Sequence, residues 1–352
     1  PESWRAITLR QLLAHTSGIP DYEANLGYDF YETDGGRQDI LAAMSGEPLD
    51  FEPGTNFSYS NTGYYLLSLV IEATSGASYA DFMQKRIFAP AGMKQTTIGA
   101  DGLATLVQGY KSADGAITPV PGIAAESTLG AGALISTVAD WNRWQNALAS
   151  EKIVSAASRD LTFHPATLAN GEEIPYGFGI IVDSFRGEAR RMHTGQTSGF
   201  VARFESYPAS DTSFLLLANC HGDRLGAMGK KLALAFVPGL DYSALALPSD
   251  PDPSMTARAR SALEQAVLQD GALDLLADGM REFAAADDYA PLRTALAPSV
   301  RTLSSFEYLK TEEVGQSGSG RFVYKAVSDE GVLYWILSFK NGLLTGMNWE
   351  EA

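Results

Sequence analysis

The sequence predicts an α+β protein of two domains, and three observations lead to that prediction. Helical patterns dominate as far as residue 149, and short apolar runs separated by turn residues follow between 176 and 219. A stretch rich in proline and aspartate at 246–256 is typical of a stiff, solvated linker. Helices followed by strands are predicted again after that linker. Separate runs of helices and strands favour an α+β fold over a parallel, doubly wound sheet.

Four helices are predicted in the first domain, residues 1–245, from apolar residues at helical spacing. In the clearest of them a dense apolar face ends at Gly76, a residue that suits a helix terminus. Ser78 can cap the helix that follows. The four predicted helices cover residues 8–15, 62–75, 78–88 and 137–149.

Four antiparallel strands are then predicted, because short apolar runs alternate with Gly, Pro, Asp or Ser. They cover residues 176–184, 189–194, 200–207 and 212–219. A further helix is predicted over about 225–236, before the linker.

The second domain, residues 257–352, repeats this order on a smaller scale. Helices are predicted over 254–298 and four strands over 304–349, with turns near 315–318 and 329–331. Asn341-Gly342 between two apolar runs is a strong hairpin signal. We expect a small α+β accessory domain, comparable with nuclear-transport-factor-2-like (NTF2-like) or cystatin-like modules by fold-level analogy alone.

Composition excludes several classes of function. The chain has 26 basic and 42 acidic residues and a net charge of −16, which argues against nucleic acid or an anionic membrane as partner. With Cys220 as the only cysteine, no disulfide can form within the chain. No metal-binding spacing and no cofactor motif occurs, so neither a metal nor a cofactor is expected. A Gly-x-Ser-x-Gly motif is also missing, which argues against an α/β-hydrolase.

Tyr59-Ser60-Asn61 precedes the predicted helix at 62–75 and is the first candidate site. A tyrosine hydroxyl beside cationic groups can lose its proton more easily and act as a base. The asparagine can donate a hydrogen bond to a substrate carbonyl. The alternative is that both residues only cap the helix.

His193-Thr194-Gly195 lies between two predicted strands and is the second candidate site. A donor, a small hydroxyl and a glycine would let a substrate lie along the edge of a strand, since glycine permits close approach. The alternative is a glycine-rich connection with an incidental histidine.

Together the two sites resemble the second and third motifs of the serine penicillin-recognising hydrolases, which include penicillin-binding proteins. Tyr59-Ser60-Asn61 is similar to the Tyr-x-Asn of the class C β-lactamase, esterase and D-aminopeptidase branch. His193-Thr194-Gly195 stands at the Lys-Thr-Gly position, with histidine for lysine. The resemblance covers about the first 245 residues and implies a β-lactamase-like fold, in which an antiparallel sheet and a helical region flank the active-site cleft. Four more segments resemble family landmarks in the same order: 9–19, 51–54, 130–137 and 176–179.

The family's nucleophile, a serine in a Ser-x-x-Lys motif, has no counterpart in this sequence. None of the serines is followed by lysine three residues later. In the family the motif lies upstream of the segment that resembles 9–19. We therefore expect the nucleophile in a separate N-terminal segment. A degenerate homologue without catalytic activity is the alternative.

The resemblance implies acyl transfer through a serine ester, followed by hydrolysis. Tyr59 would act as base for the attack and as acid for the leaving group. Asn61 would orient the substrate carbonyl or amide, and His193 would donate a hydrogen bond to Tyr59 or to a substrate carboxylate. The backbone N–H of Gln196 would form half of the oxyanion hole.

Thr194 and Gly195 would line the strand edge where a small-molecule or peptide acyl substrate binds. Histidine in place of lysine favours esters, amides or D-amino-acid peptides. A permanent lysine charge suits a substrate carboxylate better than a histidine whose ordinary pKa is about 6.5. The alternatives are a β-lactamase or D-Ala-D-Ala carboxypeptidase, and an inactive binding homologue. By the same resemblance, the protein is expected to be bacterial and periplasmic or secreted.

Two other histidines are interpreted as structural. His15 lies in a His-Thr-Ser-Gly run, where we expect a helix to end with the ring facing the negative end of the helix dipole. Cys220-His221 follows an apolar run at 214–218, where a buried cysteine at the end of a strand is expected rather than a nucleophile or metal ligand.

Overall fold

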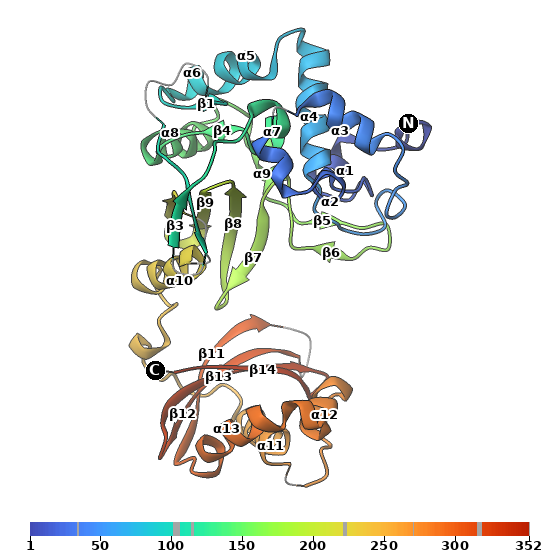
Figure 1. Ribbon diagram of the computed structural model, residues 1–352. Coiled ribbons are helices and arrows are strands. Elements are labelled where there is room, and N and C mark those ends of the chain that lie inside the picture. The colour runs from blue at the N-terminus through green and yellow to red at the C-terminus, as the bar shows by residue number, and fades with distance from the viewer. Residues whose placement is uncertain are drawn as a thin grey trace. The chain divides into compact units, whose positions relative to one another are not determined.

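The computed structural model describes residues 1–33, 35–100, 106–113, 116–220, 224–269, 271–314 and 319–351. The chain forms two units (Figure 1). The first unit comprises Pro1–Ser184 and Ala189–Ala233, and the second comprises Phe185–Glu188 and Leu234–Ala352. The proline-rich stretch at 246–256 therefore lies within the second unit, where helix α11 begins at Pro253.

Helix α4, Asn61–Ser75, is the longest helix of the first unit and confirms the helix predicted over 62–75. It begins where the Ser60 side chain accepts a hydrogen bond from the N–H of Gly63, and it ends at Gly76 in the left-handed conformation. The shorter helices around it are α1 (Leu9–Leu13), α2 (Tyr22–Leu26), α3 (Arg37–Met44), α5 (Tyr79–Met83), α6 (Ala89–Ala91), α7 (Ala125–Gly132), α8 (Val138–Ala149) and α9 (Ala156–Thr162).

Buried tyrosines hold α4 against its neighbours. The side chains of Tyr22 and Tyr65 are fully buried, and each hydroxyl donates a hydrogen bond to a backbone carbonyl of α7. Gly130 of α7 permits this close approach, since a Cβ there would lie 2.6 Å from the backbone oxygen of Tyr64. The start of α4 is thereby fixed relative to the segments on either side of it.

The main sheet of the first unit contains four strands in the order β10-β9-β8-β7. Strands β8 (Glu188–Thr197), β9 (Phe200–Tyr207) and β10 (Thr212–Ala218) confirm three predicted strands. Strand β7 covers only Ile181–Phe185, so the strand predicted from residue 176 was wrong in its first half. Tyr176 and Ile181 form an isolated antiparallel bridge, and Gly179 between them has a φ of 74°. The chain reverses there instead of extending.

Three two-stranded pairs complete the described strands of the first unit. They are β1 (Thr97–Ile98) with β4 (Leu134–Ile135), β2 (Tyr110–Ala113) with β3 (Ala116–Pro119), and β5 (Ala166–Thr167) with β6 (Glu173–Ile174).

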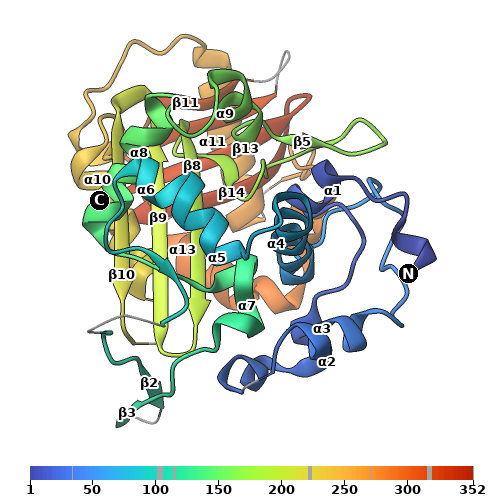
Figure 2. The same ribbon diagram turned by 90° about the horizontal axis from the view of Figure 1, so that it is seen from above.

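The two faces of the main sheet have different coverings (Figure 2). Successive residues of a strand point to opposite faces. Helix α10, Arg224–Phe236, lies over the face that carries Arg203, because a Cβ on Gly229 would be 2.7 Å from the Nε of that arginine. On the other face His193 pairs with Phe204, whose ring centroid is 5.1 Å from that of Trp141 in α8.

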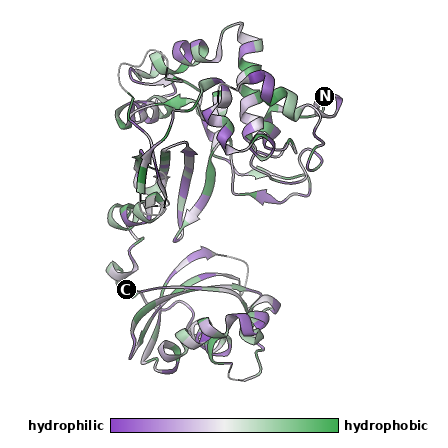
Figure 3. Ribbon diagram, in the orientation of Figure 1, coloured by the Kyte–Doolittle hydropathy of each residue, from purple (hydrophilic) through white to green (hydrophobic). Residues whose placement is uncertain are grey.

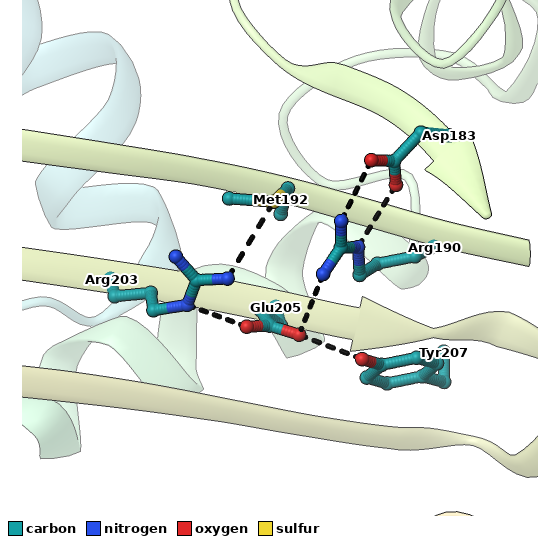
Figure 4. Close-up of polar contacts among 6 residues, drawn as sticks. All are labelled: Asp183, Arg190, Met192, Arg203, Glu205 and Tyr207. Atoms are coloured by element: carbon teal, nitrogen blue, oxygen red, sulfur yellow. Dashed lines mark hydrogen bonds and ion pairs between the residues drawn. The ribbon is translucent and has the colours of Figure 1, made fainter. Parts of the chain in front are cut away.

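A charged network lies on the α10 face of the sheet (Figure 4). Glu205, only 1% exposed, accepts hydrogen bonds from Arg203 at 2.6 Å and from the Tyr207 hydroxyl at 2.7 Å. Arg190 lies 3.6 Å from the same carboxylate and donates to both oxygens of Asp183, at 2.9 and 2.7 Å. These contacts join three adjacent strands.

The second unit packs three helices on a four-stranded antiparallel sheet, as predicted. Trp335 and Leu337 of the sheet are fully buried in the core that the helices share, whereas Tyr334 and Ile336 face a second cluster with Tyr242. Figure 3 shows hydrophobic and hydrophilic residues mixed along these helices, as expected when only one side of a helix is buried. The elements are α11 (Pro253–Leu268), α12 (Asp278–Ala285), α13 (Ala290–Arg301), β11 (Ser305–Val314), β12 (Gly320–Ser328), β13 (Gly331–Lys340) and β14 (Leu343–Glu351).

The hairpin predicted at Asn341-Gly342 is confirmed. It joins β13 to β14, and the two residues have φ values of 53° and 77°, both in the left-handed region. The turn predicted near 315–318 and His221 lie outside the described residues.

Candidate active site

Tyr59 and His193 lie at one cluster of rings, although they come from distant parts of the sequence. Their ring centroids are 6.1 Å apart. His15 lies between them and the interior, with its ring centroid 4.2 Å from Tyr59 and 5.0 Å from Tyr176. Tyr176 is also 6.1 Å from His193. The two motifs singled out in the sequence therefore meet in space, with two further rings behind them.

Tyr59 projects from a buried support. Its side chain is 45% exposed, whereas His15 and Ser60 are 2% and 1% exposed. The backbone N–H of Ser58 donates to the backbone oxygen of His15, and that of Ser60 donates to His15 Nδ1, both at 3.0 Å. The residues before and after Tyr59 are thus both fixed to His15.

A chain of hydrogen bonds runs from His15 to the edge of β8. His15 Nε2 is 3.2 Å from the Tyr176 hydroxyl, and that hydroxyl is 3.0 Å from His193 Nε2. His193 Nδ1 is 2.7 Å from the backbone oxygen of Thr194. The chain links the end of α1, the turn before β7 and strand β8.

Asn61 is held by Asp21. The backbone N–H and the side-chain amide of Asn61 both donate to Asp21 Oδ2, at 2.9 Å. The other oxygen of Asp21 accepts from the N–H of Glu23 and so caps α2. One carboxylate therefore ties together the starts of α2 and α4 and engages one of the two N–H groups of the Asn61 side-chain amide.

The electrostatics around Tyr59 differ from the sequence-based expectation. Burial raises the pKa of Tyr59, and the charges of Asp21 and Glu23 raise it further, whereas cationic neighbours would lower it. Burial, with a smaller contribution from His193, lowers the pKa of His15 to about 4. Burial also lowers the pKa of His193. Both histidines are therefore neutral at neutral pH, and neither provides a permanent positive charge.

The residues that follow His193 lie on an accessible edge of the sheet. Thr194, Gly195 and Gln196 are exposed and pair with residues of β9. Strand β7 has five residues and β8 has ten, so β7 cannot extend alongside the whole of β8. The Gln196 side chain makes a hydrogen bond with Tyr28. A ligand lying along this edge would contact the residues that the sequence singled out.

Two residues of the site were missed by sequence reasoning. His15 does follow helix α1, but its ring is buried in the cluster, where desolvation lowers its pKa instead of the helix dipole raising it. Tyr176 belongs to the Tyr-Gly-Phe-Gly landmark but was given no role. The His-Thr-Ser-Gly run was the available signal, although the φ of 55° that turns His15 inward cannot be read from it.

The described residues hold no group of three or more histidine, cysteine, aspartate or glutamate side chains placed to share a metal ion. In the same part of the chain, no helix combines the length and apolarity needed to cross a bilayer.

An antiparallel sheet beside a helical region, with a Tyr-x-Asn turn next to a His-Thr-Gly strand, is typical of the beta-lactamase class of proteins. The profile of the beta-lactamase family matches residues 1–236, and the chain belongs to that family.

The similar proteins include penicillin-binding proteins and D-aminopeptidases. Penicillin-binding protein 4* of Bacillus subtilis (strain 168) is 34% identical over 241 residues, covering 62% of this chain and 53% of the relative. A D-aminopeptidase of Gluconobacter oxydans (strain 621H) is 30% identical over 196 residues, covering 53% and 37%. A penicillin binding protein from Bacillus halodurans has a similar crystal structure, with a TM-score of 0.57 and 25% identity over 66% of this chain and 73% of that chain. The chain spans about half the length, or less, of these curated relatives.

Proposed function

We propose that this chain forms the proton-transfer side and the substrate-binding strand of a serine hydrolase for small amides, esters or D-amino-acid peptides. One observation carries the proposal. The side chain of Tyr59 is exposed, although the residues that hold it in place are buried. Its ring centroid lies 6.1 Å from that of His193, at the accessible edge of β8. A reactive hydroxyl beside a strand edge can act on an acyl group bound along that edge.

The proposed reaction needs a serine supplied by residues outside this sequence, in a Ser-x-x-Lys motif. The serine hydroxyl gives its proton to the deprotonated oxygen of Tyr59 as the serine oxygen attacks the carbonyl carbon. Tyr59 then gives the proton to the leaving nitrogen or oxygen, the bond to the leaving group breaks, and an acyl-serine ester remains. Water hydrolyses that ester by the same route in reverse.

The raised pKa of Tyr59 suits its acid step and opposes its base step. A tyrosine surrounded by Asp21 and Glu23 holds its proton firmly, so it needs a nearby cation before it can accept a proton from serine. The lysine of the proposed motif would supply that charge. The acidic surroundings of Tyr59 therefore support the proposal that a cationic group from outside this sequence lies beside it.

The edge of β8 can bind the developing oxyanion. Thr197 and Phe200 pair across the two-residue turn between β8 and β9, and the neighbouring pair is Gln196 with Val201. Paired residues in an antiparallel ladder alternate between hydrogen-bonded and non-hydrogen-bonded positions. With Thr197 hydrogen-bonded at the turn, the N–H of Gln196 points away from β9. We propose it as half of the oxyanion hole, with Asn61 orienting the acyl group and Thr194 and Gly195 lining the edge.

The charges near Tyr59 favour a substrate that carries an amino group. Asp21 and Glu23 create a negative potential at Tyr59, and His193 is neutral, so among the described residues of this cluster none offers a positive charge to a substrate carboxylate. We therefore favour D-amino-acid amides and peptides with a free amino group over β-lactams and D-Ala-D-Ala peptides. By resemblance to penicillin-binding proteins, we also propose a periplasmic or secreted location.

Replacing Tyr59 by phenylalanine in the full-length protein tests this proposal. Hydrolysis of D-alanine p-nitroanilide should fall by about 10²–10⁴ in kcat, because the proton carrier is lost. Tyr289→Phe is a matched control, since Tyr289 is also 45% exposed but lies in the second unit. Near-normal turnover in Tyr59→Phe would assign the proton transfer to another group.

Covalent labelling tests where the nucleophile lies. Residues 1–352 contain no Ser-x-x-Lys, so a fluorophosphonate should label the full-length protein but no serine of a fragment limited to this sequence. Labelling of any serine within 1–352 would overturn the assignment of the nucleophile to a separate segment. Absence of labelling in the full-length protein would instead favour the inactive homologue.

A further inference from the structure

We propose that His15 is a positioning residue for Tyr59 and that, through Tyr176, it joins His193 in one directed chain of hydrogen bonds. The proposal rests on the proposed function of Tyr59. It assigns a role to two residues outside the Tyr-x-Asn and His-Thr-Gly motifs.

His15 holds Tyr59 through both of its neighbours and through its ring. Its backbone oxygen accepts from the N–H of Ser58, and its Nδ1 accepts from the N–H of Ser60, both at 3.0 Å. The ring of His15 lies 4.2 Å from that of Tyr59 at an interplanar angle of 32°. Rotation of the tyrosine backbone would break a hydrogen bond on one side or the other. The direction in which the hydroxyl points is therefore set by His15.

The backbone N–H of Ser60 also gives the hydrogen-bond chain its direction. A backbone N–H can only donate, so His15 Nδ1 must be without a proton. The single proton of the neutral ring then lies on Nε2 and is donated to the Tyr176 oxygen. Tyr176 in turn donates its own proton to His193 Nε2, and the proton of His193 lies on Nδ1, where it is donated to the Thr194 carbonyl. The reverse direction would leave two bare nitrogens on His15.

Burial keeps the groups of this hydrogen-bond chain neutral and shields them from water. His15, Ser60 and Tyr176 are 2%, 1% and 4% exposed, so water has little access to replace their hydrogen bonds. The lowered pKa values of both histidines agree with rings that each carry one proton. Each link of the chain then has one donor and one acceptor, and a second proton on His15 would displace the N–H of Ser60.

The consequence for His193 differs from the role expected from the sequence. In this hydrogen-bond chain, His193 Nε2 accepts from Tyr176 and His193 Nδ1–H donates to Thr194. His193 therefore has no N–H left for Tyr59 or for a substrate carboxylate. His193 instead fixes the Thr194 carbonyl at the start of the exposed strand edge. Its contribution is to hold the substrate-binding strand relative to Tyr59.

Histidine tautomers measured by NMR test the inference without reference to activity. Residues 1–352 contain four histidines, and His→Asn variants identify their signals in the full-length protein with isotope-labelled histidine. We expect the proton on Nε2 of His15 and on Nδ1 of His193 at pH 7. In Tyr176→Phe, His15 should keep its tautomer because Ser60 still donates to it, and His193 should keep its proton on Nδ1 because the Thr194 carbonyl still accepts it. The pKa of His193 should rise, because its Nε2 loses the donor that favours the neutral ring. A proton on Nδ1 of His15, or an unchanged pKa of His193 in Tyr176→Phe, would overturn the proposal.

Paired variants of His15 separate positioning from mere packing. Asparagine tolerates a φ of 55° and can place its oxygen near the position of Nδ1, whereas alanine offers no acceptor. His15→Ala should lower kcat by about 10–100-fold, the usual cost of losing a group that orients a reactive side chain, and His15→Asn should recover about tenfold of that loss. His164→Asn, at an exposed histidine outside the cluster, is the matched control.

The outcomes for the two proposals can be told apart. If Tyr59→Phe is inactive while His15→Ala has normal kcat, the positioning role fails and the proposed function stands. If Tyr59→Phe retains normal turnover while the tautomers are as expected, the proposed function fails and the directed chain stands as a structural feature. If His15→Ala does not fold, the tautomer of His15 in the wild type and the pKa of His193 in Tyr176→Phe still decide the question.

Discussion

Strand β8 separates two buried polar networks of opposite character. On the α10 face, Arg190, Arg203 and Glu205 form a cluster of full charges. On the other face, His193 belongs to a chain of neutral groups that leads through Tyr176 to His15. The charged cluster needs no particular arrangement of protons, because each group donates only or accepts only. The neutral chain of hydrogen bonds has a direction, which the N–H of Ser60 at one end and the carbonyl of Thr194 at the other both determine. A network beside a reactive group can thus be ordered by proton positions, whereas a network that joins strands can be ordered by charge.

Removing Glu205 should have the largest effect on stability. Glu205→Ala leaves two arginines in a buried environment without their shared carboxylate, and such a loss typically costs about 3–5 kcal/mol. Chemical denaturation of the first unit measures it. The control is Glu2→Ala, which breaks an ion pair whose side chains are 78% and 80% exposed and should cost well under about 1 kcal/mol. Equal losses in the two variants would show that the charged network does not hold the strands together.

The neutral hydrogen-bond chain should instead make the free energy of unfolding depend on pH. The pKa of His15 is about 4 in the folded protein and 6.5 as the ordinary value, so the unfolded chain gains a proton in this interval that the folded protein does not. The free energy of unfolding should therefore fall as pH decreases from 6.5 to 4, by up to about 3 kcal/mol from this residue. His15→Asn should lose that part of the pH dependence. Parallel curves for wild type and variant would contradict a neutral His15.

The smallest expected effect separates the hydroxyl of Ser60 from its backbone N–H. The hydroxyl accepts from the N–H of Gly63, which caps α4, and donates to the backbone oxygen of Pro20 at 3.4 Å, while the backbone N–H donates to His15. Ser60→Ala removes only the bonds of the hydroxyl, so the free energy of unfolding should fall by about 1 kcal/mol in a urea titration. The tautomer of His15 should stay the same in the NMR spectrum. A changed tautomer would mean that the hydroxyl, and not the backbone amide, directs the chain.

Local patterns were sufficient to predict most of the fold. Apolar spacing predicted a helix over 62–75, which is α4, and Asn341-Gly342 predicted a hairpin, because the sequence itself specifies a terminus or a turn at these places. The predicted strand from 176 failed for a local reason as well. Alternating glycines let the chain reverse between Tyr176 and Ile181, and a glycine in an apolar run does not reveal which way it will turn.

The site was only partly predictable because its order depends on long-range contacts. Tyr59, Asn61 and His193 could be singled out by their motifs. Nothing in those motifs shows that Asp21 binds the amide of Asn61, or that His15 binds the backbone on both sides of Tyr59. The φ of 55° at His15 depends on how α1 meets the start of α4. Electrostatic expectations failed for the same reason, since the acids near Tyr59 come from another segment.

The dependence of the Tyr-x-Asn turn on an upstream segment has a consequence for protein engineering. A designer who grafts residues 58–61 onto another scaffold would transfer the tyrosine but not its orientation. His15 supplies the acceptors for the backbone of that turn, and Asp21 supplies the acceptor for Asn61. The smallest transferable cassette is therefore two segments, 15–21 and 58–61, held in register by backbone hydrogen bonds. Recombination between homologues that separates these two segments should disrupt activity more often than a crossover placed after α4.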